Sequence, residues 1–139
     1  MADVHDKKTR SYNMSRIRGK DTAPEMIVRK FLFSKGIRYR LHQKKLPGKP
    51  DLVSKKYNTV VFVNGCFWHG HEGCRYFVIP KTRTEWWKNK ISSTVTKDKE
   101  NYRRLKKMGW QVLIVWECSL RGEKRNMTLE NLFQKFTNG

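Results

Sequence analysis

The stretch Val60-Val-Phe-Val-Asn-Gly-Cys-Phe-Trp-His-Gly-His-Glu-Gly-Cys74 decides how the rest of the chain must be arranged. Its first part is apolar and β-branched, which is typical of a buried strand. Its second part holds two histidines, two cysteines, two aromatic residues and a glutamate in the nine residues that begin at Cys66. A strand that ends in such a loop can hold metal ligands, proton-transfer groups and stacking surfaces on a rigid edge. We therefore expect a functional site where this strand ends.

The segments before this stretch predict a helix followed by two strands. Thr22-Ala-Pro-Glu25 is a capping box, and it opens a helix that stops at Gly36. The alternation at residues 37–41 predicts a strand with a basic outer face. A turn rich in Pro and Gly follows, and a second strand begins at Asp51. The decisive stretch then supplies the third strand, at residues 59–63.

The segments after it predict a long helix and a last strand. A second capping box, Thr82-Arg-Thr-Glu85, opens a helix that stops at Gly109. The nearly uninterrupted apolar run at residues 110–116 is expected to be a strand buried on both faces. The order helix, three strands, helix, strand predicts an α/β fold with a mixed β-sheet flanked by helices.

The length of 139 residues predicts one domain with extensions at both ends. We expect a basic N-terminal arm at residues 1–20, a core at residues 21–122 and a polar, basic C-terminal tail at residues 123–139. The arm includes Arg16 and Lys20, which are candidates for contacts with phosphates. The alternative for the arm is a solvated, disordered tail.

The charge is the most informative overall property of the chain. Lys and Arg number 31 against 12 Asp and Glu, and the formal net charge of +19 would repel itself in a compact fold unless a polyanion lay nearby. Nucleic acid is therefore the expected partner. No window approaches the roughly 20 apolar residues that span a bilayer. The polar N-terminus has no signal-peptide pattern, so we expect no membrane contact and a cytoplasmic location.

Two residues are candidates for hydrolytic chemistry. Asp51 begins one strand while the next strand ends at Asn64, and adjacent strands would bring these ends together. An aspartate there can bind Mg²⁺, although it could also be a simple turn residue. His69 is the natural proton-transfer group, because imidazole titrates near neutral pH. The alternative for His69 is a structural role.

A second group of residues predicts a structural zinc site. His71 and Cys74 have a spacing that lets one tight loop offer both to Zn²⁺. Cys118 could supply a third ligand and Asp98 a fourth, although Cys118 could also be a buried core thiol. Cys66 is assigned to the core, because no ligand spacing includes it.

Two adjacent pairs of aromatic residues flank the same loop, Phe67-Trp68 and Trp86-Trp87. Aromatic side chains usually pack in cores. Neighbours on a helix or strand cannot both face one core, so one member of each pair is expected to be exposed and able to wedge between base pairs.

Four motifs together resemble the Vsr endonucleases of very short patch repair. They are Pro-Gly-Lys-Pro-Asp51, Val-Phe-Val-Asn-Gly-Cys-Phe-Trp-His69, Thr-Glu-Trp-Trp and Trp-Gln-Val-Leu-Ile-Val-Trp-Glu-Cys118. The resemblance covers the chain from Met1 to about Gly122. It implies a variant of the PD-(D/E)XK, restriction-endonuclease-like fold. It also implies an enzyme that nicks DNA next to the thymine of a T·G mismatch, the product of 5-methylcytosine deamination.

The resemblance also implies roles for individual residues. It implies that Asp51 and the backbone carbonyl of Val63 bind Mg²⁺, that His69 is a general base or acid and that Glu25 is a supporting acid. Asn64 stands where the family motif has histidine, and asparagine cannot exchange a proton near neutral pH. The implied zinc ligands are His71, Cys74, Asp98 and Cys118, in a loop one residue longer than in the family. The implied intercalating residues are Phe67, Trp68 and Trp87.

The expected function is therefore that of a Mg²⁺-dependent, strand-nicking mismatch endonuclease acting as a monomer on double-stranded DNA. Mismatch-repair proteins are candidate partners. One alternative is a related nuclease with a different DNA target. Another is a non-catalytic, zinc-stabilised DNA-binding protein, which would need neither Asp51 nor His69.

Overall fold

The computed structural model describes residues 22–138. The predicted arm at residues 1–20, with Arg16 and Lys20, lies outside the described residues. The elements are α2 (Ala23–Ser34), β1 (Arg40–Leu41), β2 (Leu52–Ser54), β3 (Thr59–Asn64), α3 (Thr84–Lys107), β4 (Gln111–Trp116), the 3₁₀ helix η1 (Glu117–Leu120) and α4 (Lys124–Asn138). The predicted order of a helix, three strands, a long helix and a strand is confirmed.

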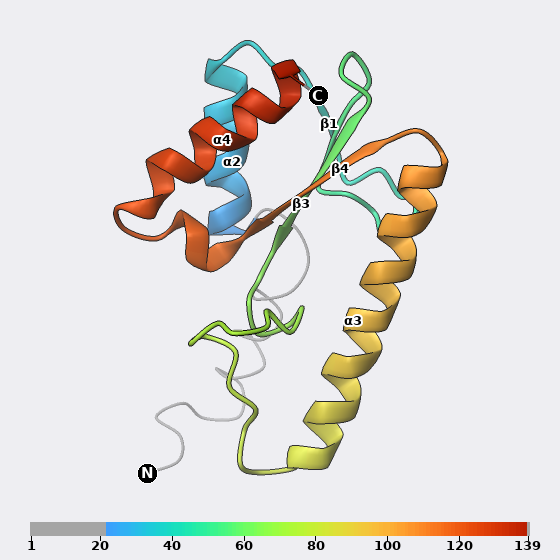
Figure 1. Ribbon diagram of the computed structural model, residues 1–139, viewed down its shortest axis with the longest axis vertical. Coiled ribbons are helices and arrows are strands. Elements are labelled where there is room, and N and C mark those ends of the chain that lie inside the picture. The colour runs from blue at the N-terminus through green and yellow to red at the C-terminus, as the bar shows by residue number, and fades with distance from the viewer. Residues whose placement is uncertain (1–21, 139) are drawn as a thin grey trace, which may run out of the picture.

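The four strands form one mixed sheet in the order β1-β2-β3-β4. β1 pairs with β2 and β2 with β3 in antiparallel fashion, whereas β3 and β4 are parallel. A parallel neighbour needs a crossover connection, and α3 is the helix in that connection. Figure 1 shows α2 and α4 on one side of the sheet and α3 on the other. The predicted mixed sheet flanked by helices is therefore confirmed.

The sheet has an apolar core on each face. The larger core lies under α2 and α4 and contains Val28, Leu32, Val61, Leu113, Val115 and Leu132 among its buried members. The smaller core lies under α3 and contains Val53, Val60, Phe62 and Leu105. Alternation along β3 and β4 sends successive side chains to opposite cores. The paired ends of these two strands are therefore held firmly from both sides.

The end of α2 explains why the first strand is shorter than predicted. Thr22 caps the start of α2 as expected, with its side chain accepting from the Glu25 N–H at 3.4 Å. At the other end Gly36 has a φ of 84°, and the Ile37 N–H donates to the Leu32 carbonyl at 3.0 Å. Ile37 is therefore part of the helix cap and not of a strand at 37–41.

Two predictions about α3 and β4 are wrong. The residue before α3 is Arg83, which has a φ of 58° and makes no side-chain cap, so Thr82 and Glu85 form no capping box. Instead the Thr84 hydroxyl donates to the Pro80 carbonyl at 2.9 Å. β4 is an edge strand, and Ile114 on it is 38% exposed, so this strand is not buried on both faces.

The prediction of a polar tail at residues 123–139 is also wrong. This segment forms α4, and Leu129, Leu132 and Phe136 on one face of it are buried in the larger core. Their spacing of three and four residues is that of an amphipathic helix. The surrounding Lys, Arg and Asn residues hid this pattern. The core therefore does not end at residue 122 but includes α4.

The packing of α4 leads to a prediction about stability. Leu132 is 4% exposed, so Leu132→Ala is expected to lower the free energy of unfolding in urea by about 2 to 5 kcal/mol. Met127 on the same helix is 71% exposed and is the matched control. Met127→Ala is expected to change stability by less than about 0.5 kcal/mol. Equal, small changes for both variants would show that α4 contributes no packing to the domain.

Candidate active site and metal centre

The start of β2 places Asp51 beside the end of β3. Leu52 pairs with Val61, so the antiparallel register carries Asp51 toward Val63. The Val63 N–H donates to Asp51 Oδ2 at 2.7 Å. In an extended strand the N–H and C=O of one residue point to the same side, so the Val63 carbonyl also faces this edge. The predicted meeting of Asp51 with the end of the third strand is therefore what the structure has.

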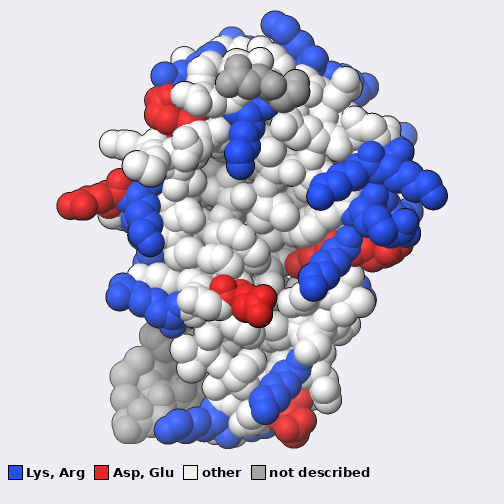
Figure 2. All heavy atoms as spheres, viewed as in Figure 1, with Lys and Arg blue, Asp and Glu red and all other residues white. Residues whose placement is uncertain are grey.

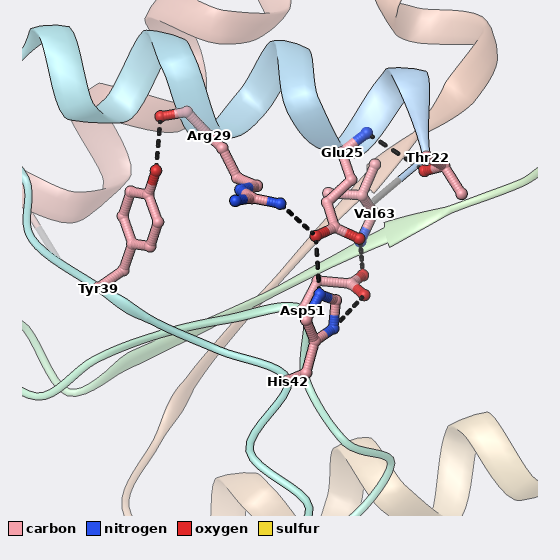
Figure 3. Close-up of polar contacts among 7 residues, drawn as sticks. All are labelled: Thr22, Glu25, Arg29, Tyr39, His42, Asp51 and Val63. Atoms are coloured by element: carbon pink, nitrogen blue, oxygen red, sulfur yellow. Dashed lines mark hydrogen bonds and ion pairs between the residues drawn. The ribbon is translucent and has the colours of Figure 1, made fainter. Parts of the chain in front are cut away.

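Glu25 and His42 complete a cluster around Asp51. Glu25 comes from the first turn of α2 and is 2% exposed. Its Oε2 lies 3.0 Å from His42 Nε2 and 3.4 Å from Arg29 Nη1, while His42 Nδ1 lies 3.9 Å from Asp51 Oδ1. Figure 3 shows the imidazole of His42 between the two carboxylates. Glu25 thus joins Asp51 as expected, whereas His42 was missed by sequence reasoning.

The electrostatics of the cluster are set by burial. Burial raises the pKa of Asp51 to about 6, against the lowering effect of the Val63 N–H. The nearby Glu25 raises the pKa further, and the charges of His42 and His69 lower it. A buried carboxylate next to a second carboxylate is electrostatically unfavourable, and a bound cation would relieve it. The donor set of Glu25, His42 and Asp51, whose ligand atoms lie within 4.8 Å of one another, fits a divalent cation.

His69 is held by Asp98, which corrects the prediction of Asp98 as a zinc ligand. His69 Nδ1 lies 2.7 Å from Asp98 Oδ2, and Asp98 projects from the middle of α3. A carboxylate at Nδ1 fixes the orientation of an imidazole and leaves Nε2 to exchange a proton. Asp98 therefore orients His69, a candidate catalytic group, and does not belong to the cluster of cysteines.

The cysteines gather around His71 in a cluster that could bind zinc. The ligand atoms of Cys66, His71, Cys74 and Cys118 lie within 4.8 Å of one another. Cys118 Sγ is 3.4 Å from His71 Nδ1, and the Cys118 N–H contacts Cys66 Sγ at 3.4 Å. Three thiols and one imidazole are a typical donor set for a structural zinc site. Cys66, which sequence reasoning assigned to the core, takes the place predicted for Asp98.

The surroundings of this cluster hold its members in place. The His71 ring stacks on Trp116 with centroids 4.0 Å apart and planes 5° apart. Gly70 has a φ of 59°, and a Cβ there would lie 2.8 Å from Ile91 on α3. Only glycine therefore lets the loop approach α3 so closely. Burial raises the pKa of the Cys66 thiol to about 12, so zinc binding would have to displace that proton.

Asn64 has a different environment from that expected of a proton-transfer group. Its side chain is 3% exposed, and its amide donates to the Tyr102 hydroxyl at 2.9 Å. Tyr102 lies on α3, and burial raises the pKa of its phenol to about 12. This pair ties the end of β3 to the long helix. Asn64 therefore contacts a neutral phenol and not a titrating partner.

The four predicted aromatic residues form one cluster. Trp87 lies 5.3 Å from Phe67, 5.7 Å from Trp68 and 4.8 Å from Trp86 between ring centroids. Trp86 is 45% exposed and carries the Arg83 guanidinium over its ring at 4.7 Å. The other three rings are half-buried. A partly exposed cluster with a cation beside it is suited to stacking on bases next to phosphates.

The surface is strongly basic. Figure 2 shows Lys and Arg side chains along both margins of one face and over α3, with a smaller number of acidic groups scattered among them. Exposed basic residues of α3 include Lys88, Lys90, Lys97, Lys99, Arg103, Arg104, Lys106 and Lys107. Within residues 22–138 no helix is both long and apolar enough to cross a membrane.

Comparisons with known proteins identify the family to which the chain belongs. Residues 2–75 match the family model described as DNA mismatch endonuclease Vsr. The chain is 49% identical to the DNA mismatch endonuclease Vsr of Escherichia coli over 125 residues, 90% of this chain and 80% of that protein. It is 46% identical to the type II nicking enzyme V.NmeAIP of Neisseria meningitidis, with 88% and 87% covered, and 45% identical to V.XorIIP of Xanthomonas oryzae, with 86% and 88% covered. The chain therefore belongs to the Vsr family of DNA mismatch endonucleases.

Proposed function

We propose that this protein is a Mg²⁺-dependent endonuclease that nicks duplex DNA next to the thymine of a T·G mismatch, in very short patch repair of deaminated 5-methylcytosine. The observation that carries the proposal is the meeting of Asp51 and Glu25 at the end of β3, the strand that leads into the loop of His69. A DNA-binding module would need no such group. The names of the relatives support both nicking and mismatch recognition.

Different residues of the chain have different roles in phosphodiester hydrolysis. Asp51, with the Val63 carbonyl beside it, would hold Mg²⁺, and Glu25 would hold water nearby. When bound, the ion supplies charge stabilisation and makes water a better nucleophile. His69, oriented by Asp98, exchanges a proton at Nε2 with the attacking water or the leaving oxygen. Asn64 and Tyr102 fix the end of β3 on which these groups depend.

Several further features belong to the same proposal. Cys66, His71, Cys74 and Cys118 would hold a structural Zn²⁺ between the ends of β3 and β4. The sheet and its helices would be a variant of the PD-(D/E)XK fold. We also infer a monomer in the cytoplasm, with mismatch-repair proteins as candidate partners. Sedimentation with and without a mismatched duplex checks the monomer.

The proposal is tested with end-labelled duplexes that contain each mismatch, with Mg²⁺ or with EDTA added briefly before the reaction. We expect one nick, beside the thymine of T·G, that requires Mg²⁺. Metal-dependent nicks on matched DNA or at another mismatch would favour a nuclease with a different target. Tight binding with no nick on any duplex would favour the non-catalytic DNA-binding protein.

The aromatic cluster leads to a prediction about mismatch selection. Unstacking a base-pair step in duplex DNA costs a few kcal/mol. A T·G pair stacks less well than a matched pair, so unstacking costs less at the mismatch. Stacking on an aromatic ring returns roughly 1 to 3 kcal/mol per base. Trp68→Ala is therefore expected to weaken binding to the T·G duplex about tenfold or more and to leave salt-sensitive binding to matched DNA nearly unchanged.

The matched control for Trp68 is Trp110, a half-buried tryptophan packed against the smaller core. Trp110→Ala should affect matched and mismatched duplexes alike, through stability. Binding is measured by fluorescence anisotropy at two salt concentrations. Equal losses on both duplexes for Trp68→Ala would show that this ring only supports the fold.

A further inference from the structure

His42 has an unusual backbone conformation that aims its side chain at Asp51. Its φ is 49°, in the left-handed region that L-residues other than glycine rarely adopt. Its N–H donates to the Asp51 carbonyl at 3.1 Å, one position beyond the last β1–β2 pair of Leu41 with Leu52. The chain turns at this point, and Figure 3 shows the imidazole lying against both carboxylates. The conformation therefore places a nitrogen donor inside the acidic site.

The three side chains come from separate parts of the fold and converge on one small volume. Glu25 is on α2, His42 follows β1, and Asp51 precedes β2. Their ligand atoms lie within 4.8 Å of one another, and Glu25 is 2% exposed. Two carboxylates and one imidazole form a mixed oxygen and nitrogen donor set. Mg²⁺ prefers oxygen donors, whereas imidazole favours first-row transition metals.

We propose that His42 is a direct metal ligand, so that the site at Asp51 holds a divalent transition-metal ion through one imidazole nitrogen and the Asp51 carboxylate, with Glu25 holding water beside it, and prefers that ion to Mg²⁺. This inference rests on the proposed function, because it concerns the same metal position. The inference adds to the proposed function one metal ligand, His42, and an order of preference among metal ions. Arg29 already provides a cation to Glu25 at 3.4 Å, so charge compensation does not by itself require an imidazole here.

The two candidate metal clusters found within residues 22–138 would then select different ions. Cys66, His71, Cys74 and Cys118 offer mainly sulfur, which favours zinc. Glu25, His42 and Asp51 offer mainly oxygen with one nitrogen. Mn²⁺ binds thiols weakly, and it can occupy oxygen-rich sites with an imidazole. Mn²⁺ added to protein that holds one zinc ion per chain, with no excess zinc, is therefore a probe of the Asp51 site.

The experiment uses the full chain with one zinc ion per chain and no excess zinc, and follows Mn²⁺ by electron paramagnetic resonance. The concentration of free Mn²⁺ gives the affinity for Mn²⁺. Displacement of bound Mn²⁺ by added Mg²⁺ gives the affinity for Mg²⁺, and pulsed spectra report any nitrogen bonded to manganese. We expect Mn²⁺ to bind about tenfold or more tightly than Mg²⁺, with a nitrogen signal. His42→Asn should weaken Mn²⁺ binding about tenfold, change Mg²⁺ binding by less than about twofold and remove the nitrogen signal.

The choice of variants separates ligation from folding. Asparagine tolerates the left-handed conformation, so His42→Asn removes the imidazole with little backbone cost. Thermal denaturation of the variant with one zinc ion per chain verifies that it is folded. His69→Asn is the matched control, because His69 is the other imidazole near Asp51 in the described part of the chain. Its loss should leave the nitrogen signal in place.

Two outcomes would overturn the role of His42 as a ligand. One is Mn²⁺ binding that disappears in Asp51→Asn but shows no nitrogen signal in the unmodified protein. The other is a nitrogen signal that survives in His42→Asn. Both leave the proposed nuclease intact, because Mg²⁺-dependent nicking is measured separately on the T·G duplex. If that nick needs no metal, the proposed function falls, whatever the manganese spectra show.

Discussion

Replacing Asp51 by asparagine is expected to lower the nicking rate about a thousandfold or more, since a metal ion contributes several kcal/mol of charge stabilisation in the transition state. Binding to the mismatched duplex should change little, because the basic surface and the aromatic cluster remain. Single-turnover nicking at saturating protein measures the chemical step, and anisotropy measures binding. Nicking within about tenfold of the unmodified rate would remove Asp51 from the mechanism.

The same substitution is expected to stabilise the protein when no Mg²⁺ is present. The pKa of Asp51 is raised from 3.8 to about 6 in the folded protein, so the unfolded chain releases its proton first as the pH rises. The stability that Asp51 contributes is therefore complete below about pH 4 and lost as the pH rises to about 6. Removing the charge should recover on the order of 2 to 3 kcal/mol at pH 7 and flatten this part of the pH dependence.

Urea unfolding at several pH values, with zinc kept bound and no Mg²⁺ added, measures this effect. Glu130→Gln is the matched control, because Glu130 is an exposed carboxylate on α4 whose side chain is 51% exposed. It should change neither nicking nor the pH dependence of stability. A less stable Asp51→Asn protein at pH 7 would mean that the carboxylate supports the fold and does not strain it.

Sequence spacing predicted the parts of the site that depend on strong local signals. The strand before Asn64 and the turn before Asp51 placed these residues correctly, because antiparallel neighbours meet at their ends. His42 could not be found in this way. Its position depends on a two-residue strand, Arg40–Leu41, and on a left-handed turn that a histidine gives no reason to expect. Both the short strand and the left-handed turn depend on tertiary packing around Asp51, which local sequence does not reveal.

The segment after Gly122 shows a different kind of failure. The spacing of Leu129, Leu132 and Phe136 was present in the sequence, and α4 follows from it. The density of charge around these residues favoured a tail instead. Buried positions at helical spacing are more informative than the average polarity of a segment, because three such side chains suffice to dock a short helix on a core.

The cluster of cysteines around His71, which could bind zinc, shows how strand pairing decides between two candidate ligands. In the parallel pair of β3 and β4, Asn64 lies opposite Trp116. Cys66 and Cys118 each come two residues later, so the equal offset carries both cysteines to the same end of the sheet. The equal offset could have been predicted from the sequence by assuming that the two strands are parallel neighbours. Asp98 lies on α3 and faces His69 instead.

Cys66, and not Asp98, lies in the candidate zinc cluster, so substitutions at these two positions should have opposite effects on the zinc content. Cys66→Ser should reduce the zinc content well below one ion per chain, because it removes a thiol whose atom lies within 4.8 Å of the other three ligands. Its melting temperature should fall by roughly 10 °C, which corresponds to about 3 kcal/mol for a domain of this size. Asp98→Asn should retain its zinc and melt within a few degrees of the unmodified protein.

The nicking rates of the folded variants complete the comparison. Asp98→Asn should nick about 10- to 100-fold more slowly and with an altered pH–rate profile, because His69 loses the carboxylate that orients it. Zinc is measured by elemental analysis of protein purified without chelators. Full zinc in Cys66→Ser would make Cys66 a core residue whose change costs only packing. Loss of zinc in Asp98→Asn would restore Asp98 as a ligand and leave His69 without its partner.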